Sequence, residues 1–179
     1  MNPRYQVEPL DKHKHNREAF SCGVVELDSY LRERAGQDIA RKVAVVYVLC
    51  EVDSFCIAGY YTLSMNAINF TDLPPKVIKK LRLPRYPALP ASLIGRLAVD
   101  VTYQGRGIGR RLLVDALQRC LRVSNEFGTM AVTVDAKGDD SRRFYEGFGF
   151  RRFPEREYSL YMPMVEIAQL FPPPSLPSE

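Results

Sequence analysis

The sequence predicts an α/β fold in which helices cover both faces of a mixed sheet of about six or seven strands. Short apolar runs rich in β-branched and aromatic residues recur along the chain, which is typical of buried strands. Between these runs, apolar residues recur at the three- and four-residue spacing of core-facing helices. One strand–helix–strand unit, residues 93–135, has the order and length of a right-handed crossover.

The composition indicates a folded domain with an apolar core. The chain has 179 residues, of which 46% are hydrophobic and 26% charged, and its formal net charge is +4. We expect a single domain over residues 1–164 and a proline-rich tail over 165–179. No apolar run is long enough to cross a membrane, and the N-terminus lacks the pattern of a signal peptide, so we expect a cytoplasmic protein.

Cysteine and histidine residues are few and scattered. Only two histidines are present, His13 and His15, and they do not share a helix face, so we expect both at the surface. This inventory predicts no metal site and reduced, buried thiols. The four cysteines form no Cys-x-x-Cys pair: Cys22, Cys50, Cys56 and Cys120.

The first half of the chain predicts one helix between strands. Residues 5–9 are typical of a short edge strand, and apolar spacing predicts a helix from about Val24 to Ala40. The β-branched run 43–51 and the longer run 55–69 follow, separated by a turn. We expect these two runs to form a hairpin.

A basic segment comes next. Residues 74–81 predict a short helix with proline in its first turn, whereas the three prolines of 83–90 predict an extended connector without regular structure. A long basic loop beside a core strand is a candidate binding surface. Its cationic residues are Lys76, Lys79, Lys80, Arg82 and Arg85.

The last third predicts one more helix and a final pair of strands. Acidic residues at 139–140 suit a helix N-terminus, and this helix ends near Gly147 or Gly149. Residues 150–153 and 158–162 then predict the last two strands.

The turn Gln104–Gly109 is the strongest functional signal. Glycines at alternate positions permit positive φ and close approach of a ligand to the main chain. The turn precedes a helix, whose first N–H groups and positive dipole end favour an anion, and Arg106, Arg110 and Arg111 add charge. We interpret it as a cradle for a pyrophosphate; the alternative is a strand–helix turn with glycines for tight packing.

Two common phosphate motifs do not match this turn. A Walker A loop requires Gly-Lys-Ser/Thr after its glycines, and here the sequence is Gly-Arg-Arg. The dinucleotide fingerprint Gly-x-Gly-x-x-Gly fails because the third glycine comes one residue early. The turn instead matches the pattern Gln/Arg-x-x-Gly-x-Gly/Ala.

That pattern resembles the acetyl-CoA loop of the GNAT (Gcn5-related) N-acetyltransferases. The resemblance extends over nearly the whole chain and depends on SLIGRLAV at 92–99, QGRGIG at 104–109 and FYEGFGF at 144–150. Within that family the chain is most similar to the aminoacyl-tRNA-acetylating toxins of type II toxin–antitoxin systems. Further matching phrases are FSCGVVELDSYL, IAGYYTLS, DLPP and VDAKGDDSRRFYEGFGF.

The resemblance implies a GNAT fold with a β-bulge and strand splay at an acetyl-CoA site, and no metal. It places the thioester oxygen and the pantetheine against the main chain of Leu97, Ala98 and Val99, where family members have the bulge. Many members carry a pantetheine-contacting Asn where this chain has Gly138–Asp140; Ser141 would replace it in part, with Phe144 in the same site. The implied cosubstrate loop comprises Gln104, Gly105, Arg106, Gly107, Ile108, Gly109 and Arg110.

Tyr145 occupies the position of the family's general acid. A phenol with a pKa of about 10 is a suitable proton donor to a leaving thiolate; the alternative is a packed aromatic residue. An α-amine, with a pKa of about 8, needs little help from a base. No base is assigned, because Asp100, Asp135 and Glu126 are better explained as turn or surface carboxylates.

The implied acceptor is the α-amine of aminoacyl-tRNA, and its acetylation would block translation. The implied partners are a ribbon–helix–helix antitoxin and a second copy in a homodimer. Two other functions stay open: a GNAT enzyme for a small-molecule, peptide or protein amine, and a non-catalytic CoA-binding module. Candidates for phosphate contacts are Arg41, Lys42, Lys79, Lys80, Arg82, Arg85 and Arg96.

Overall fold

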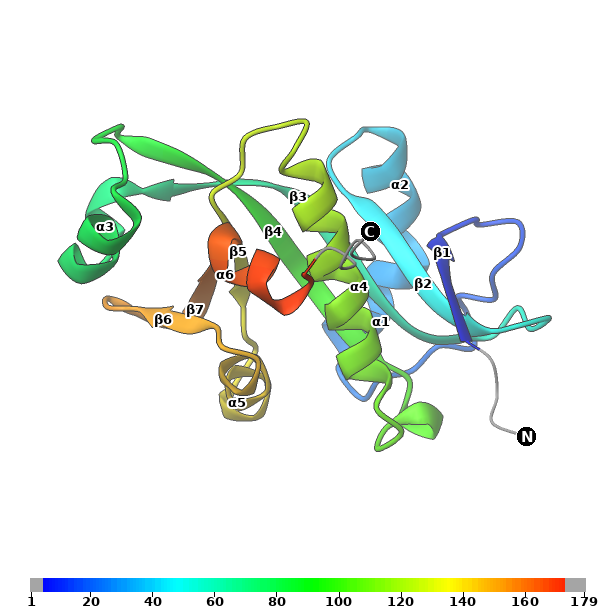
Figure 1. Ribbon diagram of the computed structural model, residues 1–179. Coiled ribbons are helices and arrows are strands. Elements are labelled where there is room, and N and C mark those ends of the chain that lie inside the picture. The colour runs from blue at the N-terminus through cyan, green and yellow to red at the C-terminus, as the bar shows by residue number, and fades with distance from the viewer. Residues whose placement is uncertain (1–4, 173–179) are drawn as a thin grey trace, which may run out of the picture. The chain divides into compact units, whose positions relative to one another are not determined.

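The computed structural model describes residues 5–172 and divides into two compact units. The first unit comprises the described residues of Met1–Met65 together with Leu93–Ala116, and the second comprises Asn66–Ser92 with the described residues from Leu117 onward. The strand order is β1-β2-β3-β4-β5-β7-β6, and the strands are labelled in Figure 1. The residues of β3 and of β4 are each divided between the two units. The predicted mixed α/β fold is confirmed.

In the first unit, three antiparallel strands follow the predicted pattern. β1 (Tyr5–Pro9) pairs with β2 (Val45–Glu51), which pairs with β3 (Ile57–Asn69). The predicted hairpin of β2 and β3 is therefore confirmed, with a register shift between Leu49 and Cys50.

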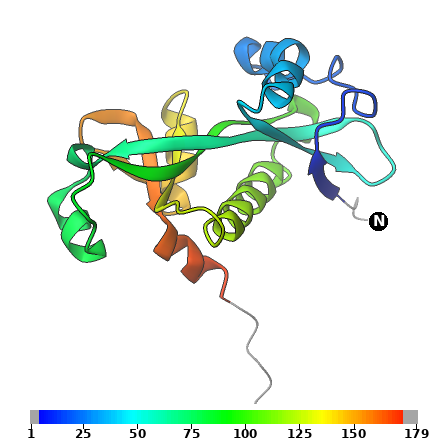
Figure 2. The ribbon, with the colours of Figure 1, turned by 90° about the horizontal axis from the view of Figure 1, so that it is seen from above.

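The predicted helix over 24–40 is interrupted by a wider turn. It consists of α1 (Val25–Ser29), a π-helical turn η1 (Tyr30–Arg34) and α2 (Ala35–Ala40). The guanidinium of Arg17 donates to two backbone carbonyls of this stretch, that of Arg32 at 3.0 Å and that of Leu31 at 3.4 Å. Figure 2 shows α1 and α2 on one side of the first unit's strands and the start of α4 (Ile108–Val123) on the other.

Gly59 of β3 brings this strand unusually close to β4 and α4. A Cβ atom at this position would lie 2.7 Å from the Leu112 side chain and 2.9 Å from the Ala98 carbonyl oxygen. Any other residue would force these elements apart. The glycine therefore fixes the start of α4 against the sheet.

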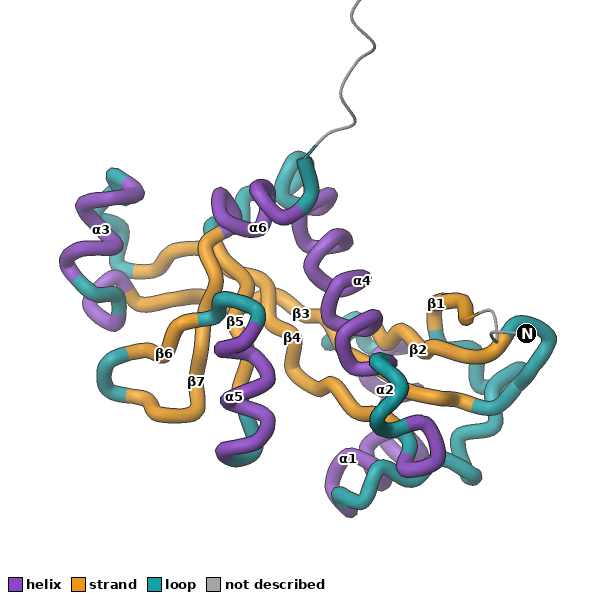
Figure 3. The backbone as a smooth tube through the Cα atoms, turned by 60° about the horizontal axis from the view of Figure 1, so that its bottom comes forward, coloured by secondary structure: helices purple, strands orange, loops and turns teal. Residues whose placement is uncertain are grey.

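The second unit has its own apolar core and its own strands. β5 (Ala131–Asp135) and β6 (Arg151–Phe153) both pair antiparallel with β7 (Arg156–Pro163). Figure 3 shows α5 (Asp139–Gly147) and α6 (Met164–Leu170) beside these strands, and both helices contact β7. Its core residues include Ile68, Leu73, Leu89, Ala91, Ala131, Phe153 and Tyr161.

The chain segment that connects the end of β3 to the start of β4 contains a 3₁₀ turn, η2 (Phe70–Asp72), and α3 (Pro75–Leu81). The short helix predicted over 74–81 is therefore confirmed. The prediction that 83–90 has no regular structure is confirmed for 83–87 and wrong for 88–90, because β4 extends over Ala88–Val99. Pro90 is tolerated in this strand because its hydrogen bond uses the carbonyl group and not the N–H that proline lacks. The Pro90 carbonyl accepts from the Met130 N–H at 2.8 Å.

Two expectations about burial are also wrong. His15 is 4% exposed and lies between Glu8, at 2.9 Å from its Nε2, and the backbone of Asp11. Cys56 is exposed, so not all four free thiols are buried. α6 occupies the first part of the predicted tail, and residues 173–179 of that tail lie outside the described residues.

Among residues 5–172, no group of three or more His, Cys, Asp and Glu side chains is placed to hold a metal ion. No helix in the same range has the length and apolar character that a bilayer crossing requires.

Candidate functional site

The glycine-rich turn of the first unit connects the end of β4 to α4. A 3₁₀ turn, η3 (Val101–Tyr103), follows β4, and residues 104–107 then lead to Ile108 at the start of α4. Gly105 and Gly107 have φ values of +75° and +76°, and a Cβ atom on either would have no neighbour within 4 Å. The glycines are therefore required by backbone conformation, and the space over their main chain is open to a ligand.

This backbone is suited to an anion. The first N–H groups of α4 have no partner within the helix, and the helix dipole is positive there. Arg106, Arg110 and Arg111 are exposed around the turn, with Arg106 5.3 Å from the ring centroid of Tyr103. Open main-chain donors surrounded by three guanidinium groups fit a diphosphate.

Gln104 belongs to the turn, but its side chain serves the protein itself. The amide Nε2 donates to the Val99 carbonyl at 3.1 Å and to the Cys22 carbonyl at 3.2 Å. Both donors are thus used to close the turn onto the end of β4 and onto the segment near Cys22. A diphosphate, which needs donors, can therefore bind Gln104 only through its main-chain N–H.

Asp100 holds the other side of the turn. Its carboxylate, 7% exposed, accepts hydrogen bonds from the Thr102 N–H at 2.9 Å, the Thr102 hydroxyl at 2.6 Å and the Ser21 N–H at 3.0 Å. Burial raises the pKa of Asp100, but these hydrogen bonds from Ser21 and Thr102 outweigh it, and the pKa is lowered. A carboxylate so engaged is a structural cap and a poor general base.

The end of β4 carries the predicted thioester-binding main chain. Ala98 is 5% exposed and packs in the core, whereas Leu97 and Val99 are half-buried. The Asp100 N–H next along donates to the Ala58 carbonyl at 2.9 Å, so the strand end is tied to β3. The bulge at Leu97–Val99 stays a prediction.

Tyr145 lies on α5 in the second unit. Its side chain is 6% exposed and packs edge-on against Phe144 and Phe150, with ring centroids 5.2 and 5.6 Å away. Burial, with a smaller effect of the Asp135 carboxylate, raises the pKa of Tyr145 above that of an ordinary tyrosine. Within residues 5–172, its hydroxyl forms no hydrogen bond. A neutral phenol with an unused proton is therefore available.

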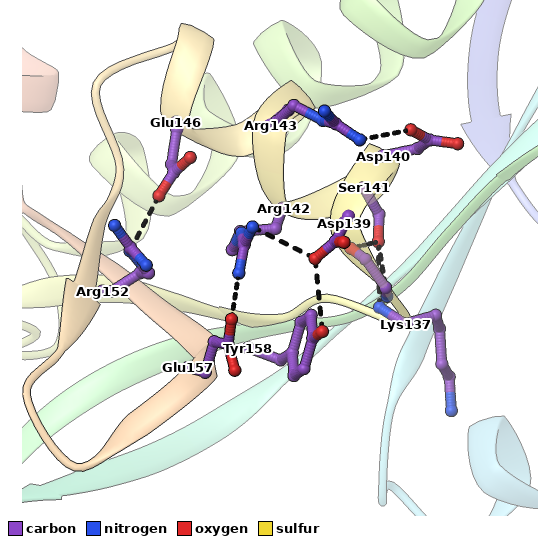
Figure 4. Close-up of polar contacts among 11 residues, drawn as sticks. Lys137, Asp139, Asp140, Ser141, Arg142, Arg143, Glu146, Arg152, Glu157 and Tyr158 are labelled. Carbon is purple, nitrogen blue, oxygen red and sulfur yellow. Dashed lines mark hydrogen bonds and ion pairs between the residues drawn. The ribbon is translucent and has the colours of Figure 1, made fainter.

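Ser141 is used in the N-terminal cap of α5. Its hydroxyl accepts from the Lys137 and Gly138 N–H groups, at 2.9 and 3.2 Å, and donates to the Gly138 carbonyl at 3.0 Å (Figure 4). Its proton and two acceptor sites are thus occupied, and the predicted pantetheine contact of this hydroxyl would have to replace one of these bonds.

An ion-pair network covers the exposed side of α5. Arg142 lies between Asp139 at 3.1 Å and Glu157 at 2.5 Å, while Arg152 pairs with Glu146 at 2.9 Å (Figure 4). The network involves residues on both sides of Tyr145 along the helix. It ties α5 to β6 and β7 and so fixes the helix that carries the tyrosine.

The predicted phosphate-binding residues fall in both units. Arg41 and Lys42 follow α2 in the first unit, and Arg82 and Arg85 follow α3 in the second; all four are exposed. Arg96 differs, because its guanidinium stacks on the Tyr30 ring at 3.6 Å and is half-buried. Its charge is thus directed onto an aromatic ring.

The candidate bases have partners or exposure that explain them without catalysis. Asp135 accepts a hydrogen bond from the Ser159 hydroxyl at 2.6 Å, and Glu126 is exposed just after α4.

The sequence did not indicate a role for Asp28, which is 7% exposed and accepts a hydrogen bond from the Cys22 N–H. The Gln104 side chain binds the carbonyl of the same residue, Cys22. The phrase FSCGVVELD indicated the family and the start of a helix, but not that the side chain of Asp28 would be buried.

Comparison with known proteins supplies independent findings. A family model described as acetyltransferase (GNAT) domain matches residues 90–166. A probable toxin TacT of Sinorhizobium fredii is 31% identical over 171 residues, which are 92% of this chain and 93% of that protein. A tRNA-acetylating toxin of Mycobacterium tuberculosis is 34% identical over 152 residues, which are 85% of this chain and 88% of that protein.

Solved structures are similar over the same extent. AtaT complexed with acetyl-methionyl-tRNAfMet has a TM-score of 0.86 at 28% identity, covering 94% of this chain and 100% of that one. AtaTR bound with AcCoA has a TM-score of 0.82 at 28% identity, with 96% and 100% covered. A tyrosine-to-phenylalanine mutant of AtaT bound to the C-terminus of the antitoxin AtaR has a TM-score of 0.80 at 25% identity, with 94% and 99% covered.

Proposed function

Because the chain belongs to the GNAT family of acetyltransferases, we propose that it transfers the acetyl group of acetyl-CoA to the α-amine of an aminoacyl-tRNA. An aminoacyl-tRNA with an acetylated amine has lost the nucleophile that forms the next peptide bond. The product blocks translation, and the protein is a toxin.

One observation carries this proposal. The similarity to AtaT complexed with acetyl-methionyl-tRNAfMet extends over 94% of the chain with a TM-score of 0.86, so it includes far more than the residues 90–166 that match the family model. The 34% identity with a tRNA-acetylating toxin over 85% of the chain supports the same acceptor.

The cosubstrate is held chiefly by main chain. The N–H groups around Gly105 and Gly107 bind the diphosphate, and Arg106 and Arg110 balance its charge. The main chain of Leu97 and Val99 pairs with the pantetheine amides, and an N–H of this stretch donates to the thioester oxygen as negative charge develops there.

The reaction is a direct displacement. The unprotonated α-amine attacks the thioester carbonyl carbon, a C–N bond forms, the C–S bond breaks, and the electron pair of that bond leaves with sulfur. Tyr145 gives its phenolic proton to the departing thiolate and regains one from the ammonium that attack creates, through solvent. The raised pKa of Tyr145 keeps the acid protonated before attack.

The acceptor needs no dedicated base. An α-amine has a pKa of about 8, so a useful fraction is neutral near pH 7.5, whereas a lysine side chain with a pKa of about 10.4 is almost wholly charged. The carboxylates considered as bases are engaged or exposed, which favours an α-amine over a lysine.

The tRNA backbone is bound by exposed cations. Arg41 and Lys42 in one unit, and Arg82 and Arg85 in the other, present charge to solvent and can contact phosphates. The contribution of Arg96 is smaller, since its guanidinium is stacked on Tyr30.

The toxin has an antitoxin partner. AtaT is related to this chain and has been seen bound to the C-terminus of the antitoxin AtaR. By resemblance we assign the partner to the ribbon–helix–helix class and the toxin to a homodimer.

Incubation of the purified protein with acetyl-CoA and a charged tRNA pool tests the acceptor. Mass spectrometry of the nuclease-released aminoacyl-adenosine is expected to show a mass increase of one acetyl group on the α-amine. Unmodified aminoacyl-tRNA together with an acetylated small amine or peptide in a parallel assay would replace this proposal with a GNAT enzyme of different acceptor. Binding of acetyl-CoA without any turnover would indicate a non-catalytic module.

A further inference from the structure

The segment Phe20–Gly23, which we call the latch, crosses the first unit between α1 and the glycine-rich turn. Phe20 is 2% exposed, with its ring centroid 5.4 Å from that of Tyr60. At the other end Gly23 has a φ of +86°, which lets the chain reverse into α1. The two residues between them are hydrogen-bonded from two directions.

On one side the latch is bonded to the cosubstrate loop. The Ser21 N–H donates to the Asp100 carboxylate at 3.0 Å, and the Val101 N–H donates to the Ser21 carbonyl at 2.8 Å. The Gln104 amide donates to the Cys22 carbonyl at 3.2 Å. The loop residues 100–104 are thus held against the latch through both backbone and side chain.

On the other side the latch is bonded to Asp28 of α1. Oδ1 of Asp28 accepts from the Cys22 N–H at 2.8 Å, and Oδ2 accepts from the Ser21 hydroxyl at 3.3 Å. Asp28 is 7% exposed, so its carboxylate depends on these donors in place of water. The same two latch residues therefore bond both Asp28 and the loop.

We propose that Asp28 is a positioning residue for the acetyl-CoA loop and acts through the latch. Asp28 forms no hydrogen bond with residues 100–110, yet the latch cannot keep its place when Cys22 loses its partner. The Gln104 and Asp100 contacts then lose their fixed anchor, and the amides of Gly105 and Gly107 lose their preset orientation. This inference rests on the proposed function, because it assigns the loop to acetyl-CoA.

Calorimetric titration with CoA, below the unfolding temperature of every variant, tests this role. Asp28→Ala is expected to raise the Kd for CoA about tenfold, as expected for the loss of one hydrogen bond to a charged group. Asp28→Asn keeps an acceptor for the Cys22 N–H and is expected to stay within about threefold of the wild type. The matched control is Asp38→Ala, which removes the 2.9 Å hydrogen bond from the Tyr30 hydroxyl and leaves the latch intact.

A double-mutant cycle separates transmission through the latch from independent effects. Gln104→Ala removes the loop's side-chain bond to Cys22 but leaves the Ser21 bonds to Asp100 and Val101, so Asp28→Ala should cost less affinity in this background than in the wild type. The double variant is expected to bind CoA more weakly than either single variant, but less weakly than the product of the two effects. Effects that multiply in full would show that Asp28 acts by another route and would overturn the inference.

Two more results are decisive. If the wild type binds CoA and Asp28→Ala binds it equally well, the latch inference is wrong and the proposed function stands. If Asp28→Ala and Asp38→Ala weaken binding equally, the effect is general loss of stability, and the positioning role is again wrong. A wild type that does not bind CoA contradicts the proposed function itself.

Discussion

The cosubstrate loop of the first unit and the basic segment 76–85 of the second are both assigned to phosphate, but they are built in opposite ways. The loop positions main-chain donors with two positive-φ glycines, and Asp100 and Gln104 bond it to the latch. The basic segment instead displays Arg82 and Arg85 in solvent, and within residues 5–172 neither side chain forms a hydrogen bond or ion pair.

The difference teaches how each site selects its ligand. A fixed array of N–H groups recognises the shape of a diphosphate, so it tolerates few substitutions and is moderately sensitive to salt. Exposed arginines recognise charge, so each contributes a similar amount and their binding falls steeply with salt. Substitutions should therefore have larger effects in the first unit's loop than in the basic segment.

The largest effect is expected at the chemical step, which neither region performs. Tyr145→Phe removes only the phenolic proton, and we expect the rate at saturating substrates to fall about 10²- to 10⁴-fold, the range for a lost general acid. The thermal midpoint should hardly change, because the hydroxyl has no partner among the described residues. Tyr158→Phe is the matched control, since its hydroxyl donates to Asp139 at 3.2 Å on the exposed side of α5.

A rate for Tyr145→Phe within twofold of the wild type would remove the proton donor from the mechanism. Equal losses in Tyr145→Phe and Tyr158→Phe would point to disturbance of α5 instead.

The loop is tested next with Gly107→Ala. Alanine at a φ of +76° costs about 1–2 kcal/mol, and relief of that strain turns the peptide away from its position. We expect the Kd for acetyl-CoA to rise about tenfold or more. In the control Gly128→Ala, an added Cβ has no neighbour within 4 Å and no positive φ is present, so acetyl-CoA binding should be unchanged. Unchanged binding in Gly107→Ala would refute the account of the loop.

The basic segment is tested with Arg82→Ala and Arg85→Ala. Each is expected to weaken tRNA binding about threefold to tenfold and to reduce the slope of log K against log salt by about one for each lost phosphate contact. The KM for acetyl-CoA should not change. Lys12→Ala, which removes an exposed cation that we assign no role, is the control. A salt slope that these arginine variants leave unchanged would exclude the segment from the tRNA interface.

The smallest effect concerns pH. The pKa of Asp100 is lowered in the fold, so its charged form stabilises the native state above the unfolded pKa of about 3.9, and this stabilisation is lost as pH falls through the folded pKa. Asp100→Asn should therefore lower the free energy of unfolding near pH 7 more than near pH 3. Denaturant unfolding from pH 7 to pH 3 measures the difference in the free energy of unfolding between the wild type and Asp100→Asn. A difference that grows as the pH falls would contradict this explanation.

The sequence could predict the features that depend on local backbone geometry, but not the contacts between distant residues. Apolar periodicity located the helices and strands, and glycine spacing located the loop, because both are local consequences of backbone geometry. The sequence could not show that the Gln104 side chain binds the Cys22 carbonyl, or that His15 is buried beside Glu8. Both contacts join residues that only the fold brings together. Pro90 misled the prediction of β4, because a proline whose carbonyl carries the bonding is compatible with a strand.

The central claim is that main-chain amides of residues 105–109 hold the diphosphate of acetyl-CoA. Amide resonances of ¹⁵N-labelled protein, followed during titration with CoA, test it directly. The account predicts that the largest shifts occur at Gly105, Gly107 and the first residues of α4. Saturable binding of CoA that leaves these amides unperturbed while others shift would contradict it.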